Sequence, residues 1–151
     1  MRCAMAVGTG VLLLAGCGAP VRVLVDGAPI DVAELVRRFP LEATANLRAD
    51  PIGRTQGASL HVVQIRGGEA PHRHVAHDLV VTLVRGEGTL TLAGTRHPLA
   101  AGDVAVVPRG TSHWFVRSGC QPAVAVATFV PPLDAPDVVL DGGVDSAGAT
   151  R

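Results

Sequence analysis

The sequence predicts an all-β fold, a barrel or sandwich of short strands preceded by one short helix. Turn-forming residues are abundant, with 18 glycines and 11 prolines in 151 residues, and this content favours many short strands over long helices. From residue 58 onward, apolar segments begin roughly every 8–12 residues with turn residues between them, which is typical of all-β domains. A hydrophobic content of 48% provides a core, and with three Phe, one Trp and no Tyr it must consist mainly of aliphatic residues.

The charge balance argues against one large class of partners. Basic and acidic residues number 13 each, and the sequence contains no basic run. Domains that bind nucleic acids need a basic patch to neutralise phosphates. We therefore expect no nucleic-acid partner, and the length is that of one domain.

The predicted barrel covers residues 58–140. The segment 79–84 is apolar at nearly every position, which predicts a strand that is covered on both faces. Residues 141–151 have almost no apolar side chains, so we expect a flexible tail there. The other strands of the barrel are predicted at 59–66, 89–92, 97–99, 104–107, 113–116 and 123–130.

Residues 21–57 form the predicted N-terminal segment, which carries the one clear helix pattern. Asp31 is a capping residue with Glu34 three positions later, and apolar residues recur at helical spacing after it. Pro40 ends this helix, because proline lacks the backbone donor that a further turn needs. We expect the helix to pack against the barrel, and we predict a first strand at residues 21–25.

Residues 1–16 have the pattern of a secretory signal peptide. Arg2 gives the positive start, and residues 7–15 are apolar over a length too short to span a membrane. The segment ends in Leu-Ala-Gly-Cys at positions 14–17, which resembles a bacterial lipobox. The resemblance implies cleavage before Cys17 and attachment of acyl chains such as palmitate to that residue. The alternative is an ordinary buried strand or helix that ends at Cys17.

A lipidated cysteine would anchor the protein in the cell envelope, because several acyl chains on one residue hold a protein stably on a membrane. Residues 17–20 would then be the lipidated cysteine and a short tether. Gly18, in the place of an Asp after the cysteine, implies the outer membrane, on its periplasmic side or at the cell surface. Because Cys3 leaves with the signal and Cys17 is acylated, we expect no internal disulfide at Cys120.

Three of the six histidines lie close together at His72, His74 and His77, and Asp78 follows directly. Imidazole and carboxylate groups are ligands of divalent transition metals. On a strand, His72 and His74 point to the same face, whereas His77 has the opposite parity. Asp78 shares the face of the first two if the strand continues or the turn compensates. His113 follows a second Gly/Pro turn and reaches the same site if the fold brings its strand close.

Two segments resemble the motifs of a known family. Residues 67–86 contain a glycine, a His-x-His pair, an acid and a second glycine. Residues 102–113 contain Gly, five residues, Pro-Arg-Gly, two residues and His. These segments resemble the first and second motifs of the cupins. The resemblance implies a double-stranded β-helix, or jelly-roll barrel, commonly dimeric. It also implies a metal site in which an acid joins His72, His74 and His113.

The identity of the acid is left open by the resemblance. Asp78 stands where the family usually has Glu, but the interval from Asp78 to Gly86 is one residue longer than usual. Counting back from Gly86 puts Leu79 in the acid's place. His77 is the alternative fourth ligand if a bulge turns it inward. Otherwise His77 lies behind the ligands or faces solvent.

Four other residues near the motifs are not expected to bind the metal. Glu69 and Glu87 are expected to be exposed charges in turns. His61 lies on a strand that can line the barrel, and its role is either in the pocket or in the packing. Trp114 either walls the pocket or serves packing alone.

Three or four nitrogen and oxygen ligands without a thiolate suit divalent Fe, Mn, Ni, Cu or Zn. Such a site leaves positions open for water or substrate, which permits Lewis-acid chemistry, isomerisation or oxygen activation. The first hypothesis is a lipid-anchored envelope cupin that binds a metal and a small molecule without assigned catalysis. The second is a metal-dependent enzyme, a dioxygenase or small-molecule isomerase, at the membrane surface. The third is a metal-free structural barrel.

Overall fold

The structure is a computed structural model that describes residues 20–141. The predicted signal peptide, Cys17 and all but the first residue of the predicted tail lie outside this range. Within it, the chain forms twelve strands and one short helix, so the predicted all-β fold with a short N-terminal helix is confirmed. The elements are β1 (Arg22–Val25), β2 (Ala28–Asp31), α1 (Val32–Arg38), β3 (Leu47–Arg54), β4 (Ser59–Ile65), β5 (His72–His74), β6 (Asp78–Arg85), β7 (Glu87–Leu92), β8 (Thr95–Ala100), β9 (Val104–Val107), β10 (His113–Arg117), β11 (Ala123–Val130) and β12 (Val138–Leu140).

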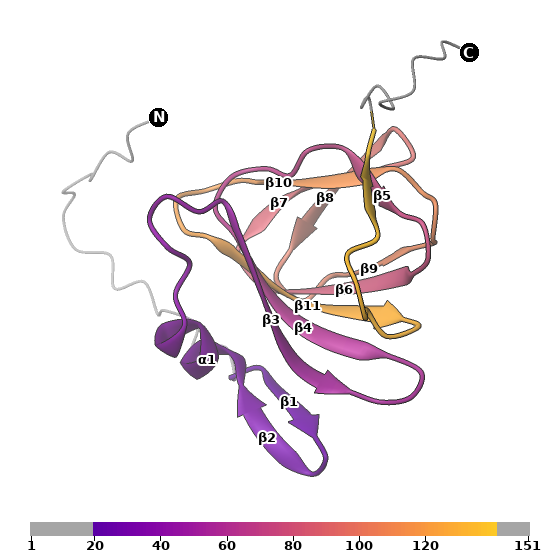
Figure 1. Ribbon diagram of the computed structural model, residues 1–151. Helices are drawn as coiled ribbons and strands as arrows, with labels where there is room; N and C mark the ends of the chain where they lie inside the picture. Colours follow the sequence, from indigo (N-terminus) through magenta and orange to yellow (C-terminus); the bar gives the residue numbers. More distant parts are fainter. Residues whose placement is uncertain (1–19, 142–151) are drawn as a thin grey trace, which may run out of the picture.

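Two five-stranded sheets form the barrel. One has the strand order β12-β5-β10-β7-β8, and the other has the order β3-β4-β11-β6-β9. Every pairing within them is antiparallel. In Figure 1 the first sheet lies above the second, and the hairpin of β1 and β2 extends below the second sheet together with α1. This arrangement is the predicted jelly roll.

Strand β11, at the centre of the second sheet, is covered on both faces, which explains its nearly continuous apolar sequence. Along β11, Ala125 packs inside the barrel, while its neighbour Val124 packs on the outside against Val32 and Val36 of α1. Alternate side chains of a strand point to opposite faces, so both faces of this strand need apolar residues. The helix therefore serves as a cover for the outside of the barrel, as predicted.

The ends of the helix follow the predicted signals. Asp31 is the N-cap, and its Oδ1 accepts a hydrogen bond from the backbone N–H of Glu34 at 3.0 Å. This bond satisfies one of the donors that an isolated helix start leaves unpaired. The helix ends at Arg38, with Phe39 as the C-cap and Pro40 directly after it. The cap also fixes the direction in which the chain leaves the β1–β2 hairpin.

The barrel begins earlier than predicted. Strand β3 pairs with β4 along its length and belongs to the same sheet, so the barrel includes residues 47–54 that were placed in the N-terminal segment. Its sequence did not indicate a strand, because it contains Pro51 and several charged residues. An edge strand tolerates both, since proline cannot donate to a neighbour and charges protect an exposed edge.

Two further observations concern Cys120 and membrane-spanning helices. Cys120 is disulfide-bonded, so the expectation of no internal disulfide is wrong for the 151-residue chain. That expectation assumed removal of residues 1–16 and acylation of Cys17, whereas the full chain retains three cysteines. Among residues 20–141, no helix is long and apolar enough to cross a membrane.

Candidate metal centre

Three histidines from two neighbouring strands converge inside the barrel. His72 and His74 stand at the two ends of β5, and because they are two residues apart their side chains point to the same face. Strand β10 pairs with β5, and its first residue, His113, lies directly opposite His72. One candidate ligand atom from each ring lies within 4.8 Å of the others. The structure thus brings together the three histidines of the two motifs.

The Nδ1 atom of each ring is held by an oxygen. Nδ1 of His72 lies 2.9 Å, and Nδ1 of His113 3.0 Å, from the carbonyl oxygen two residues earlier in the chain. Nδ1 of His74 lies 2.8 Å from Oδ1 of Asp137. An oxygen acceptor requires the hydrogen of a neutral ring to be on Nδ1, so Nε2 of each ring keeps its lone pair. The three Nε2 atoms are therefore the atoms that can bind a metal.

The histidine cluster is buried, and burial keeps His113 in the form that binds metals. His72, His74 and His113 are only 9%, 7% and 3% exposed. Burial lowers the pKa of His113 to about 4, although its hydrogen bond to the Thr111 carbonyl acts in the opposite direction. The ring of Phe129 packs edge-on against His74, with 5.1 Å between ring centroids. At neutral pH His113 is uncharged and needs to lose no proton before it binds a metal.

Asp137 joins this cluster to the segment that precedes β12. Its Oδ1 accepts from His74, and its Oδ2 lies 2.5 Å from Nδ1 of His77 and accepts from the backbone N–H of Ala76 at 3.1 Å. Burial raises the pKa of Asp137, but the hydrogen bonds from His77 and His74 outweigh it and lower the pKa to about 2. Asp137 therefore stays ionised at neutral pH and orients the ring of His74.

His77 does not face the cluster. Its Nδ1 binds Asp137, and its Nε2 lies 3.2 Å from the carbonyl oxygen of Pro132. Both ring nitrogens thus face oxygen atoms, one of Asp137 and one of Pro132. His77, the alternative fourth ligand, therefore does not belong to the group of three histidines that could hold a metal. It braces Asp137 from behind the ligands instead.

Asp78 is not brought to the cluster, contrary to the prediction. Its Oδ1 accepts from the backbone N–H of Arg109 at 2.9 Å, and its Oδ2 lies 2.7 Å from Nη2 of the same residue. The hydrogen bonds from the Arg109 side chain and backbone lower the pKa of Asp78 to about 2. Asp78 and Leu79 are adjacent on β6, so they point to opposite faces. Leu79 is the buried one that lines the cavity, in agreement with the count back from Gly86.

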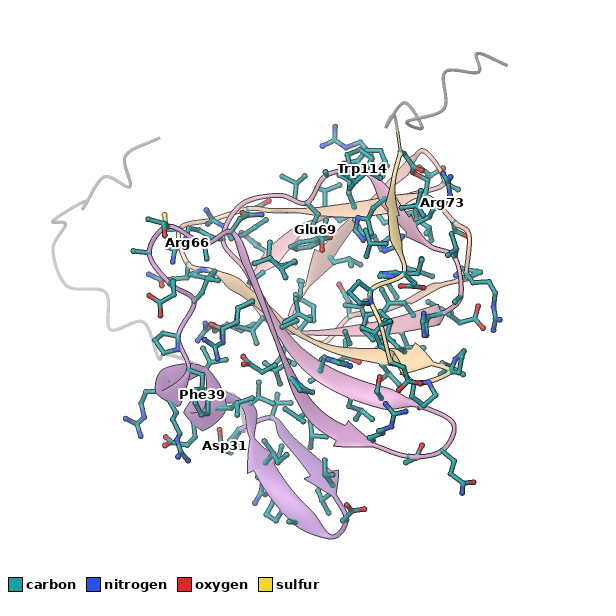
Figure 2. All side chains as sticks on the ribbon, in the orientation of Figure 1. Asp31, Phe39, Arg66, Glu69, Arg73 and Trp114 are labelled. Carbon is teal, nitrogen blue, oxygen red and sulfur yellow. The ribbon has the colours of Figure 1, made fainter. Side chains whose placement is uncertain are left out.

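Glu69 is the acid that the sequence interpretation misplaced. It was expected to be an exposed turn charge, but it lines the same cavity as the three histidines. Its Oε2 accepts from the backbone N–H of Phe115 at 2.9 Å. Burial raises the pKa of Glu69, while the Phe115 hydrogen bond and the nearby His72 and His74 lower it. Figure 2 shows Glu69 inside the barrel, next to β10.

The position of Glu69 has a local cause. The segment before β5 already pairs with β10, through a bridge between Gly68 and Val116 and a hydrogen bond from the Glu69 N–H to the Phe115 carbonyl. Two consecutive glycines, Gly67 and Gly68, indicate a turn from sequence alone. The sequence signal that could have placed Glu69 at the site is its position directly after these glycines and close to the His-x-His pair.

A cavity of about 570 Å³ lies against the histidine cluster. Most of its wall is aliphatic, and His61 is part of it. Nε2 of His61 lies 3.1 Å from Oγ of Ser59, its ring packs edge-on against Phe129, and burial lowers its pKa. Of the two roles considered for His61, the structure shows a place in the pocket wall. Trp114 does not line this cavity; it lines a second hollow on the other face of its sheet.

Comparisons with known proteins agree with the fold. The sequence profile described as "Cupin domain" matches residues 59–129. An uncharacterized protein of Aquifex aeolicus (strain VF5) is 34% identical over 109 residues, which are 72% of this chain and 88% of that protein. The chain therefore belongs to the cupin family.

Solved structures show the same architecture. KdgF from Halomonas sp. is 24% identical, with a TM-score of 0.58, over 65% of this chain and 91% of that chain. A double-stranded β-helix protein from Klebsiella pneumoniae is 22% identical, with a TM-score of 0.60, over 72% of this chain and 95% of that chain. At these identities the likeness concerns the fold alone.

The donor set of the cluster fits a divalent transition metal. Cupins commonly bind such an ion, and the three buried histidines offer three nitrogen atoms with no thiolate. Three protein ligands leave further coordination positions open, as in catalytic rather than structural zinc sites. The nitrogen ligands alone do not identify the metal, because the affinities of divalent first-row metals follow the same order at most such sites.

Proposed function

We propose that this protein is a cupin of the cell envelope that binds a divalent Fe, Mn, Ni, Cu or Zn ion through His72, His74 and His113, and a small molecule in the adjacent cavity. The observation that carries the proposal is the fixed orientation of the three rings. Each Nδ1 is bound to an oxygen, so three Nε2 lone pairs are available within a buried cluster. Three imidazole rings held this close, each with Nδ1 bound to an oxygen, are an arrangement typical of metal sites.

The metal role is tested by measuring metal content and affinity in matched variants. We expect about one equivalent of transition metal in the purified protein by mass spectrometry of the metal. The His113→Ala variant should lose the metal, because only two of the three histidine ligands remain. His97→Ala is the control, since His97 is exposed on β8. Absence of stoichiometric metal in the wild type, or equal metal content in the two variants, would contradict the proposal.

An enzymatic function is the second candidate, and Glu69 favours it. A bound metal would supply Lewis-acid chemistry or oxygen activation, and Glu69 adds a half-buried carboxylate in the same cavity. A carboxylate in this position can hold a proton of a bound molecule. Oxygen uptake with enediol, flavonoid and thiol substrates, compared with His74→Ala, tests a dioxygenase. Exchange of substrate C–H hydrogen with deuterated solvent tests an isomerase.

The lipid anchor is proposed from the sequence Leu-Ala-Gly-Cys at positions 14–17. We expect radiolabelled palmitate to enter the wild type and not the Cys17→Ser variant, and the variant to leave the outer-membrane fraction or stay unprocessed. Acylation uses the sulfur of Cys17, so it excludes a disulfide between Cys17 and Cys120. Mass spectrometry that found this disulfide in the membrane-purified protein would overturn the anchor.

A homodimer is also proposed, because cupins of this size are commonly dimeric. Strand β9 ends its sheet and leaves Val104 and Val106 exposed. A second copy that covered this edge would remove apolar surface and unpaired backbone groups from water. Light scattering of the purified protein distinguishes a dimer from a monomer.

A further inference from the structure

The cavity next to the three histidines has a mostly apolar wall. Both sheets contribute to this wall, which includes Val63, Ile65, Leu83, Leu90, Phe115 and Ala125. Removal of apolar ligand surface from water is favourable, and pockets for small molecules are commonly of this kind. The wall therefore selects a molecule with an apolar body.

The carboxylate and guanidinium groups that line the cavity are few and all of one sign. No arginine lines it, and all 13 basic residues of the chain are arginines. Three acids line it. Asp137 is bound to two histidines, and Asp134 forms an exposed ion pair with Arg54 at 2.5 Å. Glu69, the third acid, forms no ion pair with a basic residue in the described part of the chain.

The Glu69 carboxylate is held in place and keeps one oxygen for a ligand. Oε2 is fixed by the backbone N–H of Phe115. Between residues 20 and 141, no protein group donates a hydrogen bond to Oε1. Oε1 is not sealed from the cavity, so it can accept a hydrogen bond from a donor group of a bound molecule. In Figure 2 Glu69 lies within the barrel, on the cavity side of β10.

We infer that the cavity binds an uncharged molecule with an apolar body and a hydroxyl or N–H group at one end, and that Glu69 accepts a hydrogen bond from that group. This inference rests on the proposed function, because the molecule occupies the cavity next to the metal centre. Glu69 is then the residue that determines which end of the ligand faces the histidines.

The same arrangement rejects anions. A carboxylate or phosphate in this cavity would lie near the negative charge of Glu69, and it would have no guanidinium group to pair with. Like charges in a poorly solvated site repel strongly, and this repulsion is a common source of specificity. A bound metal attracts anions, so the effect of Glu69 is measured both with and without the metal.

The test uses two probes of the same shape and different charge, 4-propylphenol and 4-propylbenzoate. Their dissociation constants are measured by NMR titration, with the metal-loaded protein and with the chelator-treated protein. In the chelator-treated wild type we expect the phenol to bind at least about tenfold more tightly than the benzoate. Glu69→Gln keeps an acceptor for the Phe115 N–H and removes the charge. It should improve benzoate binding about tenfold or more in both forms while phenol binding changes little.

Glu87→Gln is the matched control, because Glu87 is exposed at the start of β7, and it should change neither constant. Equal binding of the two probes, binding of neither probe at millimolar concentration, or an unchanged benzoate constant in Glu69→Gln overturns the inference. A parallel metal titration keeps the two proposals apart. If the protein bound the phenol selectively but bound no metal, the proposed metal centre would be wrong and the inference about the ligand would stand.

Discussion

Asp137 binds Nδ1 of His74 at 2.8 Å, although 63 residues separate them in the chain. The contact depends on β12, which pairs with β5 and brings the C-terminal segment beside the metal centre. In Figure 1 the yellow β12 runs alongside β5. Since Asp137 also binds His77, one carboxylate fixes the orientation of His74 and anchors the C-terminal segment.

The first prediction concerns this carboxylate. Asp137→Asn removes the charge that orients His74, and such changes behind a metal ligand typically weaken metal binding about 10–100-fold. We expect a loss of this size in a competition titration against a chelator. Asp134→Asn is the control, because Asp134 lines the same cavity but pairs with Arg54. Equal affinities in the two variants would show that Asp137 has no role at the metal.

The second prediction concerns Asp78, which pairs with Arg109. Asp78→Asn should leave metal affinity unchanged, because Asp78 does not belong to the histidine cluster. A metal affinity that fell as far as in Asp137→Asn would contradict this placement.

The same variant should show a pH-dependent change in stability. The folded pKa of Asp78 is lowered to about 2, below the value of about 3.9 for an unfolded chain. The stabilisation is therefore complete above about pH 4 and is lost as the pH falls towards 2. The difference in melting temperature between wild type and Asp78→Asn should shrink over this interval. A difference that stayed constant from pH 6 to about 2 would contradict the ion pair.

The third prediction concerns the close approach of β7 and β10. A Cβ added at Gly88 would clash with Cζ of Phe115 and would meet the carbonyl oxygen of Val116 at 2.5 Å. The ring could move, but the backbone oxygen could not without a shift of the strand. Gly88→Ala should therefore lower the free energy of unfolding by about 1–3 kcal/mol, as overpacking does.

Chemical denaturation measures this change, with Gly57→Ala as the control. A Cβ at Gly57 meets nothing within 4 Å, so this substitution should have little effect or a small stabilising one. If both variants were equally stable, the strands would be further apart than the structure shows.

The fold and the three histidines of the site were predicted from local patterns and from the spacing of the motifs. The period of two in β5 placed His72 and His74 on one face, and the second motif brought His113 opposite them. The capping pattern of Asp31 and Glu34 located the helix. These features depend on residues close in the chain, or on motifs whose spacing implies the fold.

The parts that could not be predicted depend on register and on distant contacts. Asp78 and Leu79 differ only in which of them points inward, and a one-residue change of register exchanges them. Asp137 reaches His74 because β12 pairs with β5, and no local pattern indicates that pairing. Glu69 follows two glycines that suggested a turn, whereas the segment pairs with β10.

The fourth prediction uses the place that Leu79 occupies. Leu79 lines the cavity at the position where the count from Gly86 puts the acid of the cupin motif. Leu79→Glu should destabilise the metal-free protein by several kcal/mol, because it buries a carboxylate in place of an apolar side chain. A metal bound by the three histidines would gain a fourth ligand and offset this cost. We therefore expect added metal to raise the melting temperature of Leu79→Glu more than that of the wild type.

Leu83→Glu separates ligation from a general effect of a buried acid. Leu83 also points into the cavity from β6, but four residues further along a strand it lies about 13 Å away from Leu79. Both variants should lose stability without metal, and only Leu79→Glu should regain it when the metal is added. An equal metal-induced shift in the two variants would show that the metal does not lie at the Leu79 end of β6. The three-histidine centre would then need revision.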